Sequence, residues 1–286
     1  SQYVVVGSAV GLDLKTKAYE AARLCTYRVE QAEGGRPELK LVHRTELDGL
    51  PLAVRAFHGR LLVGVGRLLR IYDLGKRKLL RKCENKHLPN TIVDIKTMGH
   101  RVVVLDQKES FFFLKYRPAD NKLTVFCDDT HPRWCTVGAL LDYSTVVGAD
   151  KFGNVTVARV PADASDELID DPTGSKAFWD RGLLNGASQK LEVLAQYHVG
   201  ETVLSLQKAT LSPGGNECIV YTTLSGTVGA LLPFANKEDV DFFQNLEMHM
   251  RQESPPLCGR DHLAFRSFYM PVKVRPGRGE GAGRPA

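Results

Sequence analysis

A run of basic residues between positions 66 and 86 is the first feature of the sequence that could support binding chemistry. Asp73 and Glu84 are the two acidic residues in this run, so positive charge is in clear excess. Such a patch predicts contact with phosphate groups, as in RNA, or with an acidic partner surface. The simpler alternative is a set of charged outer strands that block aggregation, and Tyr72 alone interleaves the charges, which does not indicate a base-stacking platform. This basic patch consists of Arg67, Arg70, Lys76, Arg77, Lys78, Arg81, Lys82 and Lys86.

A long insertion at residues 161–190 is the second candidate, because long ordered insertions are more often functional than not. Its first part is acidic and is expected to be solvated. Its second part, residues 178–190, carries large apolar side chains that could anchor to a partner or fold back onto the protein, and both outcomes stay open. The acidic residues are Asp163, Asp166, Glu167, Asp170, Asp171 and Asp180, and the apolar ones are Phe178, Trp179, Leu183 and Leu184.

No catalytic arrangement is predicted, and no cofactor or metal. The Gly64-Val65-Gly66 run lacks the third glycine of a dinucleotide-binding loop and precedes a strand pattern, so a bend is expected there. The histidines form no metal-binding pair, and His198 and His262 are interpreted as hydrogen-bonded structural residues. Six scattered cysteines with no CxxC pair predict reduced thiols and neither a zinc site nor a disulfide framework.

Composition places the chain among ordinary globular proteins. Of its 286 residues, 43% are hydrophobic and 25% are charged, and the net charge of +5 does not by itself imply nucleic acid. No stretch approaches the roughly 20 apolar residues that would cross a bilayer, so no membrane contact is expected. The chain begins in a strand-like run without a Met, and we expect it to be a fragment of a longer protein.

The elements that would position these residues are predicted to be strands. Paired apolar runs separated by turns recur with Val63, Val104 and Val147 at equivalent places, close to the 40–45-residue period of propeller blades. The interval to the next equivalent, Tyr221, is longer because it contains the insertion. The pattern predicts an all-β protein, a partial β-propeller of four-stranded blades. A two-sheet sandwich is the alternative.

One short helix is predicted after the last blade. Asn236 can cap it, and acidic residues occupy its first turn. The helix is expected to end before Pro255-Pro256, and its apolar stripe is expected to pack against the propeller. This stripe consists of Val240, Phe243, Leu246 and Met250. Residues 272–286, rich in Gly, Arg and Pro, are expected to form a disordered tail.

Several longer runs are specific enough to carry a family resemblance. They are YDLGK at 72–76, LLRKCENK at 79–86, DKFGN at 150–154, DPTG at 171–174, WDRGLLNGASQK at 179–190, YHVGETVLSLQK at 197–208 and PLCGRDHL at 256–263. Together they closely resemble the C-terminal region of the splicing factor 3B subunit 3 family. Residues 197–201 and 265–268 also resemble the wider superfamily, which includes the large cleavage-polyadenylation specificity subunit and the damage-specific DNA-binding adaptor.

The resemblance implies a non-enzymatic scaffold in the splicing factor 3B complex, which supports branch-site recognition in pre-mRNA splicing in the nucleus. The implied partners are the HEAT-repeat subunit and the small helical subunit of that complex, and the branch-site small nuclear ribonucleoprotein. A nucleic-acid-binding propeller of the cleavage-polyadenylation or DNA-damage-binding type is the alternative, with RNA contact at the basic patch.

The resemblance further implies that residues 1–271 form the last propeller of a three-propeller protein. At the blade period given above, a seven-bladed propeller needs roughly 300 residues, so one or more blades are expected to be missing at the N-terminus. The implied partner-binding residues lie in and beside the 161–190 insertion. They are Asp171, Trp179, Arg181, Leu184, Asn185, Gln189 and Lys190.

Overall fold

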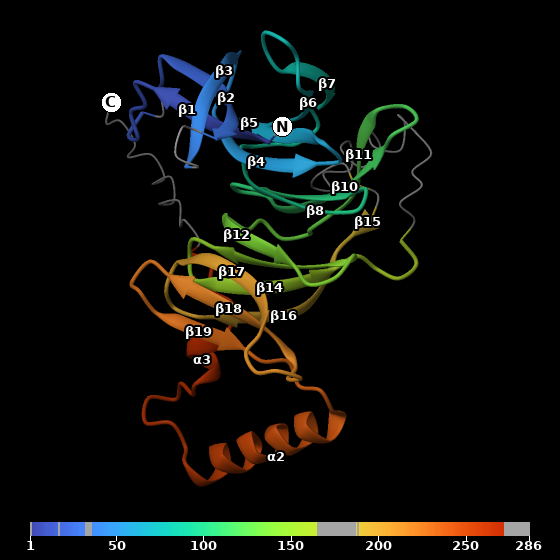
Figure 1. Cartoon of the computed structure of the whole chain (residues 1–286). Helices are drawn as coiled ribbons and strands as arrows, with labels where there is room; N and C mark the ends of the chain where they lie inside the picture. The colour runs from blue at the N-terminus through green and yellow to red at the C-terminus, as the bar shows by residue number, and fades with distance from the viewer. Residues whose placement is uncertain (1, 17, 32–35, 165–186, 188, 272–286) are drawn as a thin grey trace, which may run out of the picture.

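Five antiparallel sheets follow one another along the described part of the chain in the computed structural model (Figure 1). The structure describes residues 2–16, 18–31, 36–164, 187 and 189–271. The first sheet contains β1 (Tyr3–Val10), β2 (Ala21–Gln31) and β3 (Pro37–Leu47). The second contains β4 (Pro51–Phe57), β5 (Arg60–Val65), β6 (Leu68–Asp73) and β7 (Leu80–Asn85).

The third sheet contains β8 (Ile92–Met98), β9 (Arg101–Asp106), β10 (Ser110–Arg117) and β11 (Lys122–Asp128), and the fourth contains β12 (Cys135–Leu140), β13 (Thr145–Asp150), β14 (Asn154–Arg159) and β16 (Glu192–His198). A two-residue strand, β15 (Gln189–Lys190), joins the third sheet in parallel to β11. The fifth sheet contains β17 (Val203–Thr210), β18 (Glu217–Thr223) and β19 (Val228–Leu231). The first strands of successive sheets, β4, β8, β12 and β17, lie next to one another.

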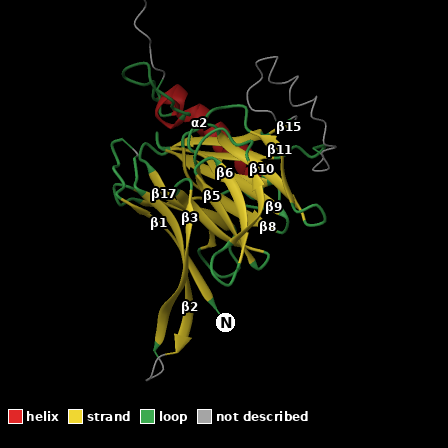
Figure 2. Ribbon diagram, turned by 90° about the horizontal axis from the view of Figure 1, so that it is seen from above, coloured by secondary structure: helices red, strands yellow, loops and turns green. Residues whose placement is uncertain are grey.

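This radial series without closure is a partial β-propeller, as predicted, and the sandwich alternative is wrong. The predicted strand pairs are also confirmed, since β5 pairs with β6, β9 with β10, β13 with β14 and β18 with β19. The β2–β3 hairpin extends well beyond the other strands (Figure 2). The described residues contain no helix long and apolar enough to cross a membrane.

Alternating burial along the middle strands explains why the sheets stack. In β9, Val102 and Val104 pack toward the second sheet, whereas Val103 and Leu105 pack toward the fourth. This is the two-residue period of a strand whose faces are both covered. Each of the four apolar clusters in the described residues lies between two adjacent sheets. A sheet therefore buries its second face only when its neighbour is present.

Glycines allow adjacent sheets to approach closely. A Cβ atom added to Gly148 of β13 would lie 2.3 Å from Cε1 of Phe111 in β10, and one added to Gly64 of β5 would lie 2.7 Å from Cβ of Ile92. Real side chains do not tolerate such distances, because packed interiors have no spare volume. The Gly64-Val65-Gly66 bend is confirmed, since β5 ends at Val65 and Gly66 has a φ of +57°.

The predicted helix is present as α2 (Lys237–Glu253), followed by a one-turn helix, α3 (Leu263–Arg266), that the sequence did not predict. Glu238 and Asp239 occupy the first turn, but Asn236 at the N-cap position makes no side-chain capping hydrogen bond. The expectation that the apolar stripe packs against the propeller is wrong. None of the helix residues is buried, and α2 lies beyond the fifth sheet, at the end of the molecule opposite β1–β3 (Figure 1).

We expect Gly148→Ala to lower the free energy of unfolding by roughly 1–3 kcal/mol, because the added methyl group overlaps the Phe111 ring. Phe111→Leu in the same background removes the overlapping ring atoms and should recover part of this loss. Urea denaturation of the two single variants and the double variant measures the coupling between the sites. Additive effects would show that the glycine does not set the distance between the sheets.

Candidate protein-interaction surfaces

The C-terminal segment is fastened to the fourth sheet by Asn154. The side-chain Nδ2 of Asn154 donates to the carbonyl oxygen of Tyr269 at 2.6 Å, and the Tyr269 amide donates to Asn154 Oδ1 at 2.9 Å. His198 Nδ1 lies 3.0 Å from the same Oδ1, which confirms it as a hydrogen-bonded structural residue. The guanidinium of Arg266 also donates to the carbonyl oxygens of His198 and Val199, at 3.3 Å each. These contacts are called the C-terminal latch below.

A buried arginine extends the latch. Arg133 is 2% exposed, its Nε donates to Asp129 Oδ2 at 2.8 Å, and its Nη1 donates to Thr156 Oγ1 at 3.1 Å. Its guanidinium lies 5.1 Å from the centroid of the Phe268 ring. The latch therefore brings together the 150–154, 197–201 and 265–268 runs, which the sequence showed only as separate stretches.

Buried carboxylates in this region shape turns. Asp106 Oδ1 accepts hydrogen bonds from the amides of Lys108 and Glu109, and Asp150 Oδ1 accepts from those of Phe152 and Asn154. Both aspartates end the second strand of a sheet, so they cap equivalent turns. Within the described residues, no group of three or more His, Cys, Asp or Glu side chains could hold a metal ion. All six cysteines are free, in line with the predicted thiols.

The insertion returns to the propeller across the third sheet. Gln189 and Lys190 pair with Cys127 and Asp128 before the chain enters the fourth sheet as β16, and the Lys190 ammonium forms an ion pair with Asp128. Ala187 and Leu191, on either side, are buried. Two of the proposed partner-binding residues, Gln189 and Lys190, are thus partly occupied in anchoring the insertion. The other five, Asp171, Trp179, Arg181, Leu184 and Asn185, lie outside the described residues.

Asp128 is a carboxylate with an unusual proton affinity. Burial raises its pKa to about 7, although Lys190 acts in the opposite direction. The backbone of Ala187 also lowers the pKa by hydrogen bonding to this carboxyl, but the effect of burial is larger. Below about pH 7 this carboxyl group therefore keeps a proton that an exposed aspartate has lost, and above that pH its ionised form pairs with Lys190.

The basic patch is exposed except for one residue. Arg70 is 5% exposed, and it pairs with Asp48 and Glu84. Glu84 also contacts Arg81 at 3.0 Å and Lys86 at 3.3 Å. The side chains of the other seven, Arg67, Lys76, Arg77, Lys78, Arg81, Lys82 and Lys86, belong to exposed residues. The patch therefore presents the charges of seven residues to solvent, whereas the charge of Arg70 is buried and paired with Asp48 and Glu84.

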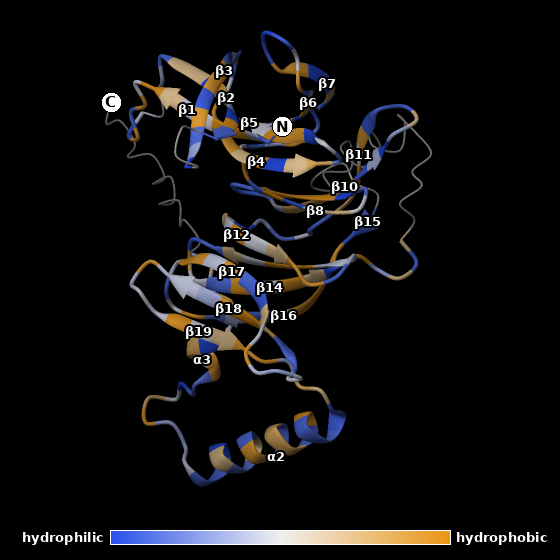
Figure 3. Cartoon of the chain, viewed as in Figure 1, coloured by the Kyte–Doolittle hydropathy of each residue, from blue (hydrophilic) through white to orange (hydrophobic). Residues whose placement is uncertain are grey.

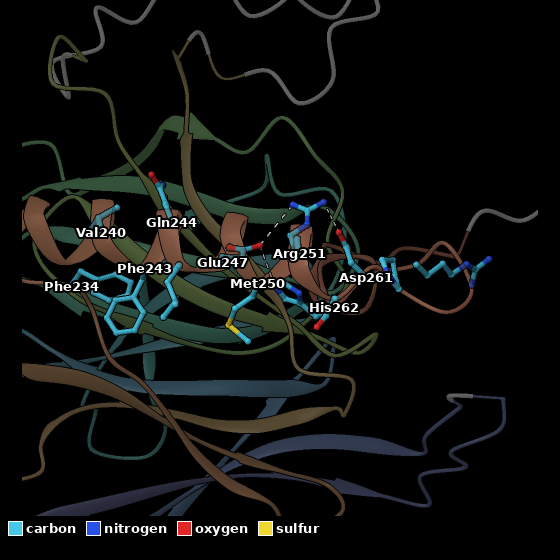
Figure 4. A pocket seen from close by; sticks show the side chains of 13 residues that line it. Phe234, Val240, Phe243, Gln244, Glu247, Met250, Arg251, Asp261 and His262 are labelled. Carbon is cyan, nitrogen blue, oxygen red and sulfur yellow. Dashed lines mark ion pairs between the residues drawn. The ribbon is translucent and has the colours of Figure 1, made fainter.

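The apolar stripe of α2 lines a groove of about 810 Å³ (Figure 4). Phe243 and Met250 face the segment before the helix and the loop after it, and Phe234 lies 5.3 Å from Phe243 between ring centroids. Arg251 pairs with Asp261 at 2.5 Å. His262 is exposed, and its Nε2 lies 3.2 Å from Glu247 Oε1. Hydrophobic and hydrophilic residues alternate along the helix (Figure 3). These contacts hold the loop against the helix rather than the helix against the sheets.

Comparison with known proteins finds relatives that match almost the whole sequence of this chain. The CPSF A subunit region family matches residues 1–279. The chain is 59% identical over 271 residues to splicing factor 3B subunit 3 of Danio rerio, and 56% identical over 271 residues to that of Drosophila melanogaster. These alignments cover 95% of this chain and 22% of either relative. Spliceosome-associated protein 130 A of Arabidopsis thaliana is 51% identical over 271 residues, which is 94% of this chain and 22% of that relative. The chain thus spans about a fifth of the length of the curated relatives it matches.

We expect Asn154→Ala to release the latch, because it removes both hydrogen bonds to Tyr269. Hydrogen exchange of the Tyr269 amide should accelerate by roughly tenfold or more, since each of the two lost hydrogen bonds contributes about 1 kcal/mol. Asn90→Ala is the matched control, because the Asn90 side chain bonds to Asp106 in the third sheet and does not touch Tyr269. Equal acceleration in both variants would contradict the latch.

The pH dependence of stability should carry the signature of Asp128. Because the folded pKa of about 7 lies above the ordinary value of 3.8, the folded protein keeps a proton that the unfolded chain releases. The stability contributed by this proton is present below the ordinary pKa and is lost as the pH rises through the folded pKa. Urea denaturation between pH 4 and pH 8 should show this decline in the parent protein and a flatter profile in Asp128→Asn. Asp120→Asn, at an exposed carboxylate, is the control and should keep the parent slope.

Proposed function

Because the chain belongs to the CPSF A subunit region family, we propose that it is part of a non-enzymatic subunit that acts in pre-mRNA splicing as a scaffold of the splicing factor 3B complex. The observation that carries the proposal is the 59% identity over 271 residues to a protein named splicing factor 3B subunit 3. That alignment covers 95% of the chain, and so most of the propeller that would present the binding surfaces.

The arrangement of the sheets supports a scaffold role. Side chains in the middle strands are committed to packing between sheets, and the buried aspartates Asp106 and Asp150 cap turns. The segments that differ from one sheet to the next are the long β2–β3 hairpin, the connection between β14 and β16, and α2. Binding residues are commonly placed on such connections by a rigid framework.

The proposed partners are the HEAT-repeat subunit and the small helical subunit of splicing factor 3B, within the nuclear ribonucleoprotein that recognises the branch site. The proposal places the protein in the nucleus. A second candidate is a nucleic-acid-binding propeller of a cleavage-polyadenylation complex, favoured by the description of the matching family. The two candidates differ in the proteins that should accompany the chain.

Affinity purification of the tagged full chain from nuclear extract, followed by mass spectrometry, separates the candidates. We expect subunits of splicing factor 3B to be enriched over a tag-only control. Enrichment of cleavage-polyadenylation or cullin-ligase subunits in their place would overturn the splicing role. A chain that enriches none of these would overturn the scaffold role for this propeller.

The proposed contacts in the insertion can be tested in the same purification. We expect Trp179→Ala and Leu184→Ala each to lower partner recovery by roughly tenfold, the loss typical of an apolar hot spot of about 1–2 kcal/mol. Leu14→Ala is the matched control, because Leu14 is a large apolar residue that is 83% exposed and remote in sequence from the insertion. Unchanged recovery in both insertion variants would remove these residues from the interface.

A further inference from the structure

A charged cleft of about 720 Å³ lies between the first and second sheets. One wall comes from β3, with Arg44, and the other from the β6–β7 connection and the start of β7, with Lys78, Leu80 and Arg81. The walls are tied together where the Leu79 amide donates to Thr45 Oγ1 at 2.9 Å. The cleft is therefore a built feature of the contact between two sheets.

The base of the cleft is electrically compensated and held in place. Arg70 Nη2 donates to Asp48 Oδ2 at 2.8 Å, and Arg70 Nε donates to Glu84 Oε2 at 2.5 Å. A buried arginine bound by two carboxylates at its planar edges is fixed in orientation. The ion-paired Arg70 therefore forms the floor of the cleft, and the positive charge that a ligand can reach lies on the residues at the edge of the cleft.

The edge of the cleft carries positive charge that is not fully neutralised by carboxylates. Within the part of the chain that the structure describes, Arg44 and Lys78 have no carboxylate partner, and Glu46 is engaged by Arg23 at 2.8 Å. Glu84 forms ion pairs with Arg70, Arg81 and Lys86, so a single negative charge faces three positive charges. Lys76 and Arg77 add two more exposed cations on the same connection. The cleft thus attracts a negatively charged group.

The walls favour carboxylates on a peptide over the phosphates of RNA. Asp48 and Glu46 also line the cleft, each beside its arginine partner. A nucleic acid carries a charge at every nucleotide and would bring phosphates against them, whereas a peptide can place an uncharged residue there. Tyr72 is 4% exposed, so its ring offers no surface on which a base could stack. Leu80 is 44% exposed and forms an apolar ledge beside the cations. This mixture fits a peptide with acidic side chains and one apolar side chain.

The geometry points to a docking site for an acidic peptide segment of a partner protein in the cleft between β3 and β7. The peptide carboxylates pair with Arg44 and Lys78 and approach Arg81, while an apolar peptide side chain rests on Leu80. The inference does not depend on the splicing role, because it uses only the charges and the shape of this cleft.

Fluorescence anisotropy of the purified full chain tests the site with three labelled probes. They are an eight-residue peptide of Asp and Glu with a central Leu, the same peptide with Asn and Gln in place of the acids, and a ten-nucleotide oligouridine. We expect the acidic peptide to bind at least about tenfold more tightly than either of the others. Its affinity should fall as salt rises from 50 to 300 mM, because exposed charges are screened over roughly 10 Å.

Charge reversal locates the site. Lys78→Glu and Arg44→Glu should each weaken the acidic peptide by at least about fivefold, because an attraction becomes a repulsion. Arg55→Glu makes the same change of net charge at an exposed position of β4 outside the cleft, and should leave affinity within about twofold. If a charge-reversed variant fails to fold, Lys78→Gln replaces it, because this change removes the charge and keeps the side chain similar in size. Equal or tighter oligouridine binding would assign the cleft to nucleic acid, and absent peptide binding or equal loss in Arg55→Glu would also overturn the peptide site.

Discussion

Burial of both faces of the middle strands β9 and β13 is the constraint on which the rest of the molecule depends. A sheet with apolar residues on both sides cannot be stable alone in water, because each face needs a cover. In β9 and β13 every residue is buried, and neighbouring positions pack into different clusters. The order of the sheets follows from this requirement. Segments outside these strands are not bound by this requirement, and the β2–β3 hairpin and α2 are two of them.

The architecture could be predicted from the sequence because it depends on a local pattern of apolar residues. Alternating apolar residues around Val63, Val104 and Val147 recur at the length of one blade, and each recurrence became the second strand of a sheet. The helix could be located for the same reason, since its acidic first turn and apolar spacing are local signals. Its docking could not be predicted, because where a helix lies depends on how the segments at its two ends are anchored.

The contacts between segments far apart in the chain could not be predicted from sequence patterns. Asn154 and Tyr269 are far apart in the chain, and nothing in either stretch indicates that a side-chain amide would satisfy a main-chain amide and carbonyl of the other. Arg70 was grouped with the exposed cations because its neighbours in sequence are basic. The structure separates it from them, since the period of β6 turns its side chain toward Asp48 and Glu84.

The C-terminal latch changes how the open end of the propeller behaves. Within the described residues the fifth sheet has a neighbouring sheet on one side, and the last unit of such a series is ordinarily the first to fray. Here the chain leaves β19, passes through α2 and is fastened to the fourth sheet at Asn154, so the last sheet is spanned by its own continuation. Detaching that sheet requires breaking the fastening as well as the apolar contact. The last sheet is therefore joined to its neighbour twice, by apolar packing and by hydrogen bonds at the far end of its own continuation, and such coupling between neighbouring units is expected to raise the cooperativity of unfolding.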